Sequence, residues 1–309
     1  MGQHTLISWC DSTVNPSTGC DGCELHVPGK GGPCYAGILH EGRLARSLPT
    51  LYAPTFTDVR MAPGRMNKAS AWPDLTGVAR PDKPWLDGQP RVIFVGDMGD
   101  VLSKAVSFEY LRDEVISNIV SPKGRRHLWL ILTKRPRRTV AFSRWLEQQG
   151  IAWPDNVMTG TSVTTQATAI RVGYLLEVPG RRFVSAEPMK GPVDFDPFLA
   201  GLSLLIVGGE SGAAASPMHP DWARSVRDQC VAAGVPFLFK QHGQWVPVDQ
   251  PWEQDSPKPL ASNERWCNLA GGHGFHGDEV WRMRKVGKEA AGAVLDGRQW
   301  HEFPKWVTS

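Results

Sequence analysis

The stretch Leu204-Leu205-Ile206-Val207-Gly208-Gly209-Glu210-Ser211 shows the pattern that decides the fold: an unbroken apolar run followed directly by small and polar residues. Similar runs occur at 91–95, 128–132, 157–160, 182–185 and 236–239. A short run rich in β-branched and aromatic residues, without polar alternation, is typical of a strand that is buried on both faces of a parallel sheet. We therefore expect a strand at each of these six positions.

The segments between these runs have helical character. Their apolar residues recur close to helical spacing in 108–120, 139–150, 165–177 and 220–234. Gly234 fits the C-terminal end of the last of these helices. We place a further strand at 5–9 and the first helix at 36–47. Strands and helices that alternate every 25–30 residues or so predict a parallel α/β architecture with about seven strands.

A parallel (β/α) barrel, TIM-like or partial, is the most economical arrangement of these elements, and a doubly wound open sheet is the alternative. We expect one elaborated domain over 1–309. Residues 49–89 are rich in Pro, Gly and Met and are interpreted as an insertion after the first helix. Residues 244–309 are interpreted as an irregular C-terminal cap and tail, because 244–277 are rich in Trp, Pro and Gly.

The composition is that of a soluble globular protein, with 41% hydrophobic and 21% charged residues. The net charge of +3 permits a polyanionic partner without requiring one. No run of 18 or more apolar residues occurs, so the sequence predicts no membrane-spanning helix. The N-terminus lacks the pattern of a signal peptide, so we expect a cytoplasmic protein. In that reducing compartment, clustered cysteines serve as metal ligands or catalysts more often than as disulfides.

Cys20, Cys23 and Cys34 form such a cluster near the N-terminus. Glycines surround them and allow one loop to wrap several sulfurs around a single centre. Three thiolate ligands leave a coordination position open, which chemistry at a metal requires. Cys10 is either a fourth ligand or a bystander, and Cys230 fits the apolar side of a predicted helix.

Polar residues follow the predicted strands, where parallel α/β folds concentrate their binding groups. The candidates for cofactor binding are Asp97, Lys134, Ser162, Glu187, Glu210 and Lys240. A carboxylate held in a tight loop after a strand can bind an ammonium or a ribose hydroxyl. Because strand ends are exposed in any fold, a purely structural role is the alternative for each of these residues.

Two basic runs, 123–126 and 134–138, carry the charge needed to grip phosphates. Together with the Trp-rich cap they make nucleic acid a candidate partner. The alternative is that both runs form a solvated surface.

Several phrases in the chain form distinctive motifs: Asn15-Pro16-Ser17-Thr18-Gly19-Cys20, Cys34-Tyr35-Ala36, Leu132-Thr133-Lys134-Arg135-Pro136, Val184-Ser185-Ala186-Glu187-Pro188, Val207-Gly208-Gly209-Glu210-Ser211-Gly212, Phe239-Lys240-Gln241 and Leu295-Asp296-Gly297-Arg298. These motifs resemble those of a family of phage-associated and bacterial proteins of uncharacterised function. The resemblance covers nearly the whole chain. The chain also resembles radical S-adenosylmethionine (SAM) enzymes, which place three cysteines before a (β/α) barrel.

The resemblance implies a 4Fe–4S cluster, with three irons bound by cysteines and the fourth by SAM. Many relatives place the middle cysteine where this chain has Gly31, so Cys23 is assigned as the middle ligand by its own chemistry. The implied activity is radical chemistry on an unknown substrate, for which nucleic acid or a nucleotide is a candidate. Such an enzyme requires an electron donor, and a phage-encoded chain would work in the host cytoplasm.

Two other functions stay open at this point. One is a zinc-binding or cluster-binding protein without turnover, in which Cys10 completes a closed shell of four cysteines. The other is a protein directed to nucleic acid through the basic runs and the Trp-rich cap.

Overall fold

The computed structural model describes residues 2–248, 259–274 and 279–306. Two compact units divide the chain. Unit 1 comprises Met1–Thr161, Tyr174–Phe183 and Pro304–Ser309, and unit 2 comprises Ser162–Gly173 and Val184–Phe303. The expectation of a single domain over 1–309 stays a prediction.

The main sheet has seven strands in the order in which they occur along the chain. They are β1 (Ser12–Val14), β4 (Arg91–Val95), β5 (His127–Thr133), β6 (Val157–Ser162), β7 (Arg181–Ala186), β8 (Leu204–Gly208) and β9 (Phe237–Gln241). The six strands predicted from the apolar runs are thereby confirmed. Within the described residues the order starts at β1 and stops at β9 without a ladder that joins the two, so of the predicted forms the closed, TIM-like barrel is wrong, whereas an open or partial sheet agrees with the structure. A parallel α/β sheet is the part of that prediction that holds.

The pairs β1–β4, β4–β5 and β5–β6 in unit 1, and β8–β9 in unit 2, are parallel. Every residue of β4 and β8 is buried, which explains why these strands have continuous rather than alternating apolar sequences. The strand expected at 5–9 is wrong, because the first strand starts at Ser12. Leu6 is fully exposed, and the one bridge that the described residues form ahead of β1 joins Gly2 to Thr13.

Unit 1 contains three helical runs that the sequence predicts. The first joins α1 (Tyr35–Leu39), a π-helical turn (His40–Leu44) and α2 (Ala45–Ser47). The second joins α4 (Phe108–Tyr110), a π-helical turn (Leu111–Ile116) and α5 (Ser117–Ile119). The third is α6 (Pro136–Gln148), which begins three residues earlier than expected. Pro136 suits the first turn of a helix, where an amide hydrogen has no partner to lose.

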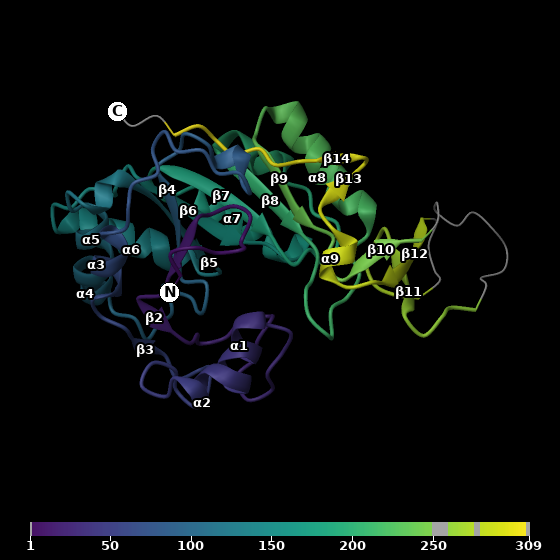
Figure 1. The fold of residues 1–309 in the computed structure, drawn as a ribbon, viewed down its shortest axis with the longest axis horizontal. Helices are drawn as coiled ribbons and strands as arrows, with labels where there is room; N and C mark the ends of the chain where they lie inside the picture. Colours follow the sequence, from purple (N-terminus) through teal and green to yellow (C-terminus); the bar gives the residue numbers. More distant parts are fainter. Residues whose placement is uncertain (1, 249–258, 275–278, 307–309) are drawn as a thin grey trace. The chain divides into compact units, whose positions relative to one another are not determined.

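The segment 49–89 contains three regular elements besides loops. These are β3 (Arg60–Met61), which pairs with β2 (Ser17–Thr18), α3 (Arg65–Ser70) and a 3₁₀ turn at Pro84–Leu86. Met66 on α3 belongs to the same core as β4, β5 and the 108–119 run, and Figure 1 shows α3 beside α5. The segment therefore contributes to the core of unit 1.

Unit 2 contains α8 (Pro220–Ala233), which ends at Gly234 with φ 67° as predicted. A glycine tolerates this left-handed conformation without strain. The helix expected at 165–177 is shorter, because a 3₁₀ turn at Gln166–Thr168 precedes α7 (Ile170–Leu175). The short helix α9 (Lys288–Ala291) follows later in the chain.

The C-terminal cap is more regular than expected. Three antiparallel strands form a sheet in the order β10 (Trp245–Pro247), β12 (Val280–Lys285) and β11 (Glu264–Asn268). A hairpin of β13 (Val294–Leu295) and β14 (Arg298–Gln299) follows. The Trp- and Pro-rich composition of this region hides the strands, because they are short and separated by loops. Residues 249–258, 275–278 and 307–309 of the predicted cap lie outside the described residues.

Across the described ranges, each helix is too short or too polar to span a bilayer.

Candidate functional site

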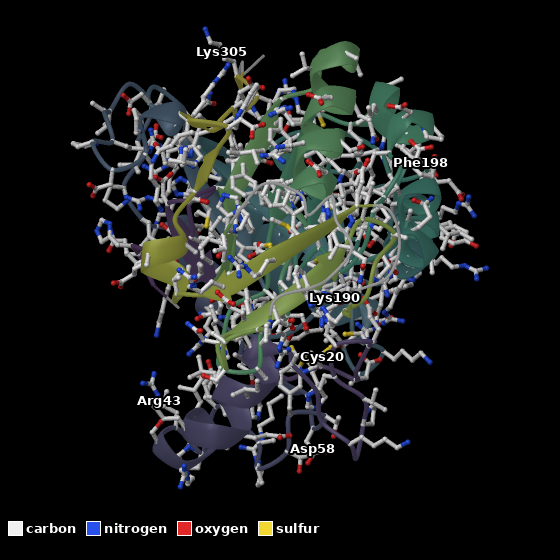
Figure 2. All side chains as sticks on the ribbon, turned by 90° about the vertical axis from the view of Figure 1, so that its right-hand side faces the viewer. Cys20, Arg43, Asp58, Lys190, Phe198 and Lys305 are labelled. Carbon is white, nitrogen blue, oxygen red and sulfur yellow. The ribbon has the colours of Figure 1, made fainter. Side chains whose placement is uncertain are left out.

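The cysteine loop of unit 1 follows β2 and is held by backbone hydrogen bonds at each of its three cysteines. The Cys20 amide donates to the Phe56 carbonyl at 2.9 Å, and the Cys34 amide donates to the Leu25 carbonyl at 3.0 Å. Cys23 and His26 exchange two hydrogen bonds of 2.9 and 3.0 Å. The positions of all three cysteines are therefore fixed by the main chain. Figure 2 labels Cys20 on this N-terminal segment.

Two glycines allow the tight path of the loop. Gly22 has φ 90°, and a Cβ atom there would lie 2.7 Å from Pro28 and 2.8 Å from the His26 carbonyl oxygen. A Cβ atom at Gly32 would lie 2.3 Å from the carbonyl oxygen of Leu25. Only glycine fits either position, so the sequence around the cysteines is dictated by close backbone packing.

All three cysteines are free thiols. Cys20 is buried, whereas Cys23 and Cys34 are half-buried. Burial raises the pKa of Cys34, while the amides of Gly37 and Ala36 and the Lys134 ammonium partly lower it. The Cys23 thiol adds to the increase.

Arg135 connects the end of β5 to the cysteine loop. Its Nη1 atom lies 3.7 Å from the Cys20 Sγ and 2.8 Å from Asp100 Oδ2. Its Nη2 atom lies 2.5 Å from Asp21 Oδ1 and donates to the Gly22 carbonyl at 2.7 Å. Burial raises the pKa of Cys20 and the Asp100 carboxylate adds to this, whereas Arg135 lowers it in part. The consecutive cations Lys134 and Arg135 thus act on two different cysteines.

Asp100 fixes the position of Arg135. Its carboxylate accepts hydrogen bonds from Thr133 Oγ1 at 2.8 and 2.9 Å, from the Leu102 amide at 2.9 Å and from the Lys134 amide at 3.0 Å. These donors fix the orientation of the carboxylate. The ion pair with Arg135 is therefore built into the turn that ends β5.

Asp97 lies at the end of β4, as predicted. Its Oδ1 atom accepts a hydrogen bond of 2.6 Å from the Asn15 side chain, whose own oxygen accepts from the Met98 amide. The Tyr35 hydroxyl donates to the Asp97 carbonyl and so ties the helix that follows Cys34 to this strand end. Burial raises the pKa of Asp97, with the Asn15 hydrogen bond opposing the shift.

A family model described as "Protein of unknown function (DUF5131)" matches residues 4–304, which is nearly the whole chain. The chain belongs to this family. No curated protein and no solved structure matches it. The predicted membership in an uncharacterised family is thus confirmed, whereas the resemblance to radical SAM enzymes and the phage association stay predictions.

The other predicted cofactor residues of this family member lie in unit 2, where they pair with neighbouring groups. Lys240 Nζ lies 2.5 Å from Glu187 Oε1. Glu210 is buried, accepts a hydrogen bond of 2.8 Å from the Ser216 amide and lies 3.1 Å from Lys190. Their charges are thus compensated within unit 2.

Ser162 is buried, and its carbonyl oxygen accepts a hydrogen bond of 3.1 Å from Arg171. That contact uses the main chain, so it gives Ser162 a structural role whatever its hydroxyl binds. The role of Ser162 in cofactor binding stays a prediction.

The basic runs are largely engaged with the protein itself. Arg125 donates to the Val120 carbonyl at 2.8 Å, and Arg126 donates to the Lys123 carbonyl at 3.1 Å. Arg137 lies over the Tyr174 ring, and Arg138 donates to the Val106 carbonyl. These contacts favour a structural role for the arginines, and nucleic acid as a partner stays a prediction.

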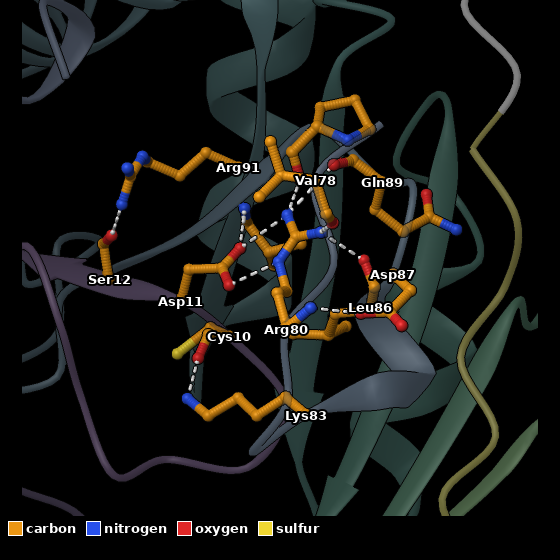
Figure 3. Close-up of polar contacts among 12 residues, drawn as sticks. Cys10, Asp11, Ser12, Val78, Arg80, Lys83, Leu86, Asp87, Gln89 and Arg91 are labelled. Carbon is orange, nitrogen blue, oxygen red and sulfur yellow. Dashed lines mark hydrogen bonds and ion pairs between the residues drawn. The ribbon is translucent and has the colours of Figure 1, made fainter. Parts of the chain in front are cut away.

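Cys10 lies in a different environment from the cysteine loop. It precedes β1, whereas Cys20, Cys23 and Cys34 follow that strand, so the two sets lie beyond its opposite ends. Figure 3 shows Lys83 donating to the Cys10 carbonyl, at 2.5 Å. This placement argues against Cys10 as the fourth ligand of a closed zinc site.

Three contributors to the cysteine site were missed from the sequence. The cysteine spacing alone does not single out Asp21, and Asn15 and Tyr35 occur only as parts of motifs. Their positions offered a signal, because each stands one or two residues from a cysteine or a strand end in those motifs.

Proposed function

We propose that this chain binds a 4Fe–4S cluster through Cys20, Cys23 and Cys34. The observation that carries the proposal is the 3.7 Å contact between Arg135 Nη1 and the Cys20 Sγ, and the Lys134 ammonium acts in the same direction by partly lowering the pKa of Cys34. A nearby cation lowers the cost of deprotonating a thiol, and thiolates are the ligands of iron–sulfur clusters. The same cations offset the negative charge that three thiolates bring to a cluster.

The donor set fits this group by its chemistry. Three thiols on one loop supply ligands for three irons and leave the fourth iron for another molecule. Within the described ranges, the structure shows no ready-made set of three or more His, Cys, Asp or Glu side chains in metal-binding geometry. The proposal therefore rests on the thiols and the charges beside them.

We propose further that SAM is the molecule bound at the open iron. The bound cluster would supply the electron that cleaves the sulfonium of SAM. In unit 1, the half-buried Asp97 carboxylate is suited to a ribose hydroxyl or an ammonium, and the Lys134 ammonium to a carboxylate. SAM contacts by Ser162, Glu187, Glu210 and Lys240 also belong to this proposal, although a ligand would have to compete with the ion pairs of unit 2.

Anaerobic purification followed by iron, sulfide and zinc analysis tests the cluster. We expect a brown protein with about four irons and four sulfides per chain. Replacement of Cys20, Cys23 or Cys34 by serine should each lower the iron content, whereas Cys230→Ala, in the buried face of α8, should not. Stoichiometric zinc without iron would contradict the proposal.

Incubation of the loaded protein with SAM and dithionite tests the second part. The expected product is 5′-deoxyadenosine. A protein with a full cluster and no cleavage would retain the iron–sulfur proposal and remove SAM from it. An electron donor in the cytoplasm and a nucleotide or nucleic-acid substrate are further parts of the proposal that this assay leaves to substrate screening.

A further inference from the structure

We infer that Arg135 is a positioning residue that raises the reduction potential of the group bound by Cys20. The inference rests on the proposed cluster and deepens it. Its basis is the contact of 3.7 Å between Arg135 Nη1 and Cys20 Sγ, made by a side chain that is only 16% exposed. Arg135 itself ligates nothing, so it acts through the cysteine.

The guanidinium has one well-defined position. Asp21 and Asp100 hold it from two sides at 2.5 and 2.8 Å, and the Gly22 carbonyl accepts a further hydrogen bond from Nη2. Charge-assisted contacts of this kind restrict the side chain to a geometry in which Nη1 points at the sulfur. The contact to Cys20 is therefore built into the fold.

A fixed cation near a ligand sulfur favours the reduced form of a cluster, because reduction adds negative charge. Hydrogen bonds to the sulfurs and local net charge are recognised determinants of cluster potential. The low exposure of the Arg135 side chain strengthens this effect, since solvent screens a largely buried charge less than an exposed charge. Removal of Arg135 would also leave the Asp21 and Asp100 carboxylates uncompensated next to Cys20, which acts in the same direction.

The experiment is a redox titration of the reconstituted protein, followed by electron paramagnetic resonance. At the midpoint of the wild-type protein, Arg135→Gln should show at least a tenfold lower ratio of reduced to oxidised cluster. This corresponds to a shift of about 59 mV toward negative potential. Arg144→Gln is the matched control, because Arg144 lies on α6, the helix that follows Arg135, but forms an exposed pair with Glu177. Its potential should equal that of the wild type.

Arg135→Lys guards against a variant that fails to take up a cluster. Lysine keeps the charge but lacks the planar guanidinium whose several N–H donors contact Asp21, Asp100 and Cys20 at the same time. We expect a negative shift smaller than that of Arg135→Gln. Full iron and sulfide with an unchanged potential in these variants would overturn the inference and leave the proposed function intact. A wild-type chain without iron or sulfide would overturn both.

Discussion

The Asp11 carboxylate and the Arg80 guanidinium form a buried ion pair in unit 1, with Nε and Oδ1 separated by 2.8 Å and each side chain 8% exposed. Asp11 Oδ2 also accepts the amide hydrogen of Val92 at 2.8 Å, next to the start of β4 (Figure 3). The remaining donors of Arg80 go to backbone carbonyls, including those of Gln89 and Pro90. One pair thus joins β1, β4 and the 49–89 segment.

Asp11→Asn should destabilise the protein by about 3–5 kcal/mol, because it leaves a buried guanidinium without its counter-charge. Urea unfolding followed by circular dichroism measures this loss as a lower midpoint. Asp113→Asn is the control, since Asp113 pairs with Arg112 at an exposed position and should leave the midpoint unchanged. Equal midpoints for Asp11→Asn and wild type would show that the pair has no net stabilising role.

Asp296 gives the motif Leu295-Asp296-Gly297-Arg298, for which the sequence indicates no function, a structural role. It occupies the turn between β13 and β14 with φ 53°, and its carboxylate lies 2.8 Å from Arg224 and 2.5 Å from Arg227, both on α8. Hydrogen bonds from Arg224 and Arg227, opposed by burial, hold the pKa of Asp296 below its usual value. The turn therefore fastens the hairpin to the helix.

Asp296→Asn removes the negative charge but keeps the turn, because asparagine tolerates the left-handed conformation. We expect a loss of about 1 kcal/mol at pH 7, as solvent screens this partly exposed pair. The wild-type advantage should be fully present above the ordinary aspartate pKa of about 3.9 and disappear as the pH falls below it through the depressed folded value. Urea unfolding of both proteins at pH 7 and pH 3 measures the difference in their unfolding free energies. An equal difference at the two pH values would contradict the prediction.

His219 should make the protein sensitive to acid. Burial lowers its pKa to about 4, with the Asp221 carboxylate opposing the shift, while the unfolded chain titrates near 6.5. The unfolded state therefore gains a proton first, and stability is lost as the pH falls from about 6.5 to 4, by about 3 kcal/mol. His219→Asn keeps a side-chain acceptor for the Asp221 amide at the start of α8.

The measurement compares unfolding free energies of wild type and His219→Asn at pH 7 and pH 4. The variant is expected to be less stable at pH 7 because the imidazole leaves a cavity. Its additional loss on acidification should be smaller than that of the wild type by about 3 kcal/mol. Parallel losses in the two proteins would assign the acid sensitivity to other groups.

Local patterns predicted much of the fold, because a strand buried on both faces has a continuous apolar sequence. The runs at 91–95 and 204–207 became β4 and β8 almost residue for residue. Closure of the sheet was not predictable, since strand number alone does not decide between an open sheet and a barrel. The strands of the cap were missed for a different reason: the short β11 and β12 are stabilised by pairing across the chain rather than by their own sequence.

The candidate site divides in the same way. The cysteines and the end of β5 could be recognised from spacing, and the structure places Arg135 Nη1 3.7 Å from the Cys20 Sγ. The ion-pair partner of Glu187 could not be recognised from the sequence, because Lys240 is 53 residues away and the pair depends on strand order. Long-range ion pairs of this kind follow from topology, which a single sequence does not specify.

Gly22→Ala tests whether the path of the cysteine loop matters for the proposed cluster. Alanine at φ 90° is strained, and its methyl group would press against Pro28 and the His26 carbonyl, which borders Cys23. We expect lower iron and sulfide content after anaerobic reconstitution, with a circular dichroism spectrum like that of the wild type. The reason is that the strain can be relieved only by moving the segment between Cys20 and Cys23.

Gly42→Ala is the matched control for this loop variant. Gly42 lies in the helical run that follows Cys34, its φ is not positive, and a Cβ atom there meets nothing within 4 Å. Alanine should stabilise that helix by about 0.5–1 kcal/mol and leave the iron content unchanged. If Gly22→Ala bound as much iron and sulfide as Gly42→Ala, the close backbone packing at Gly22 would have no part in presenting the cysteines.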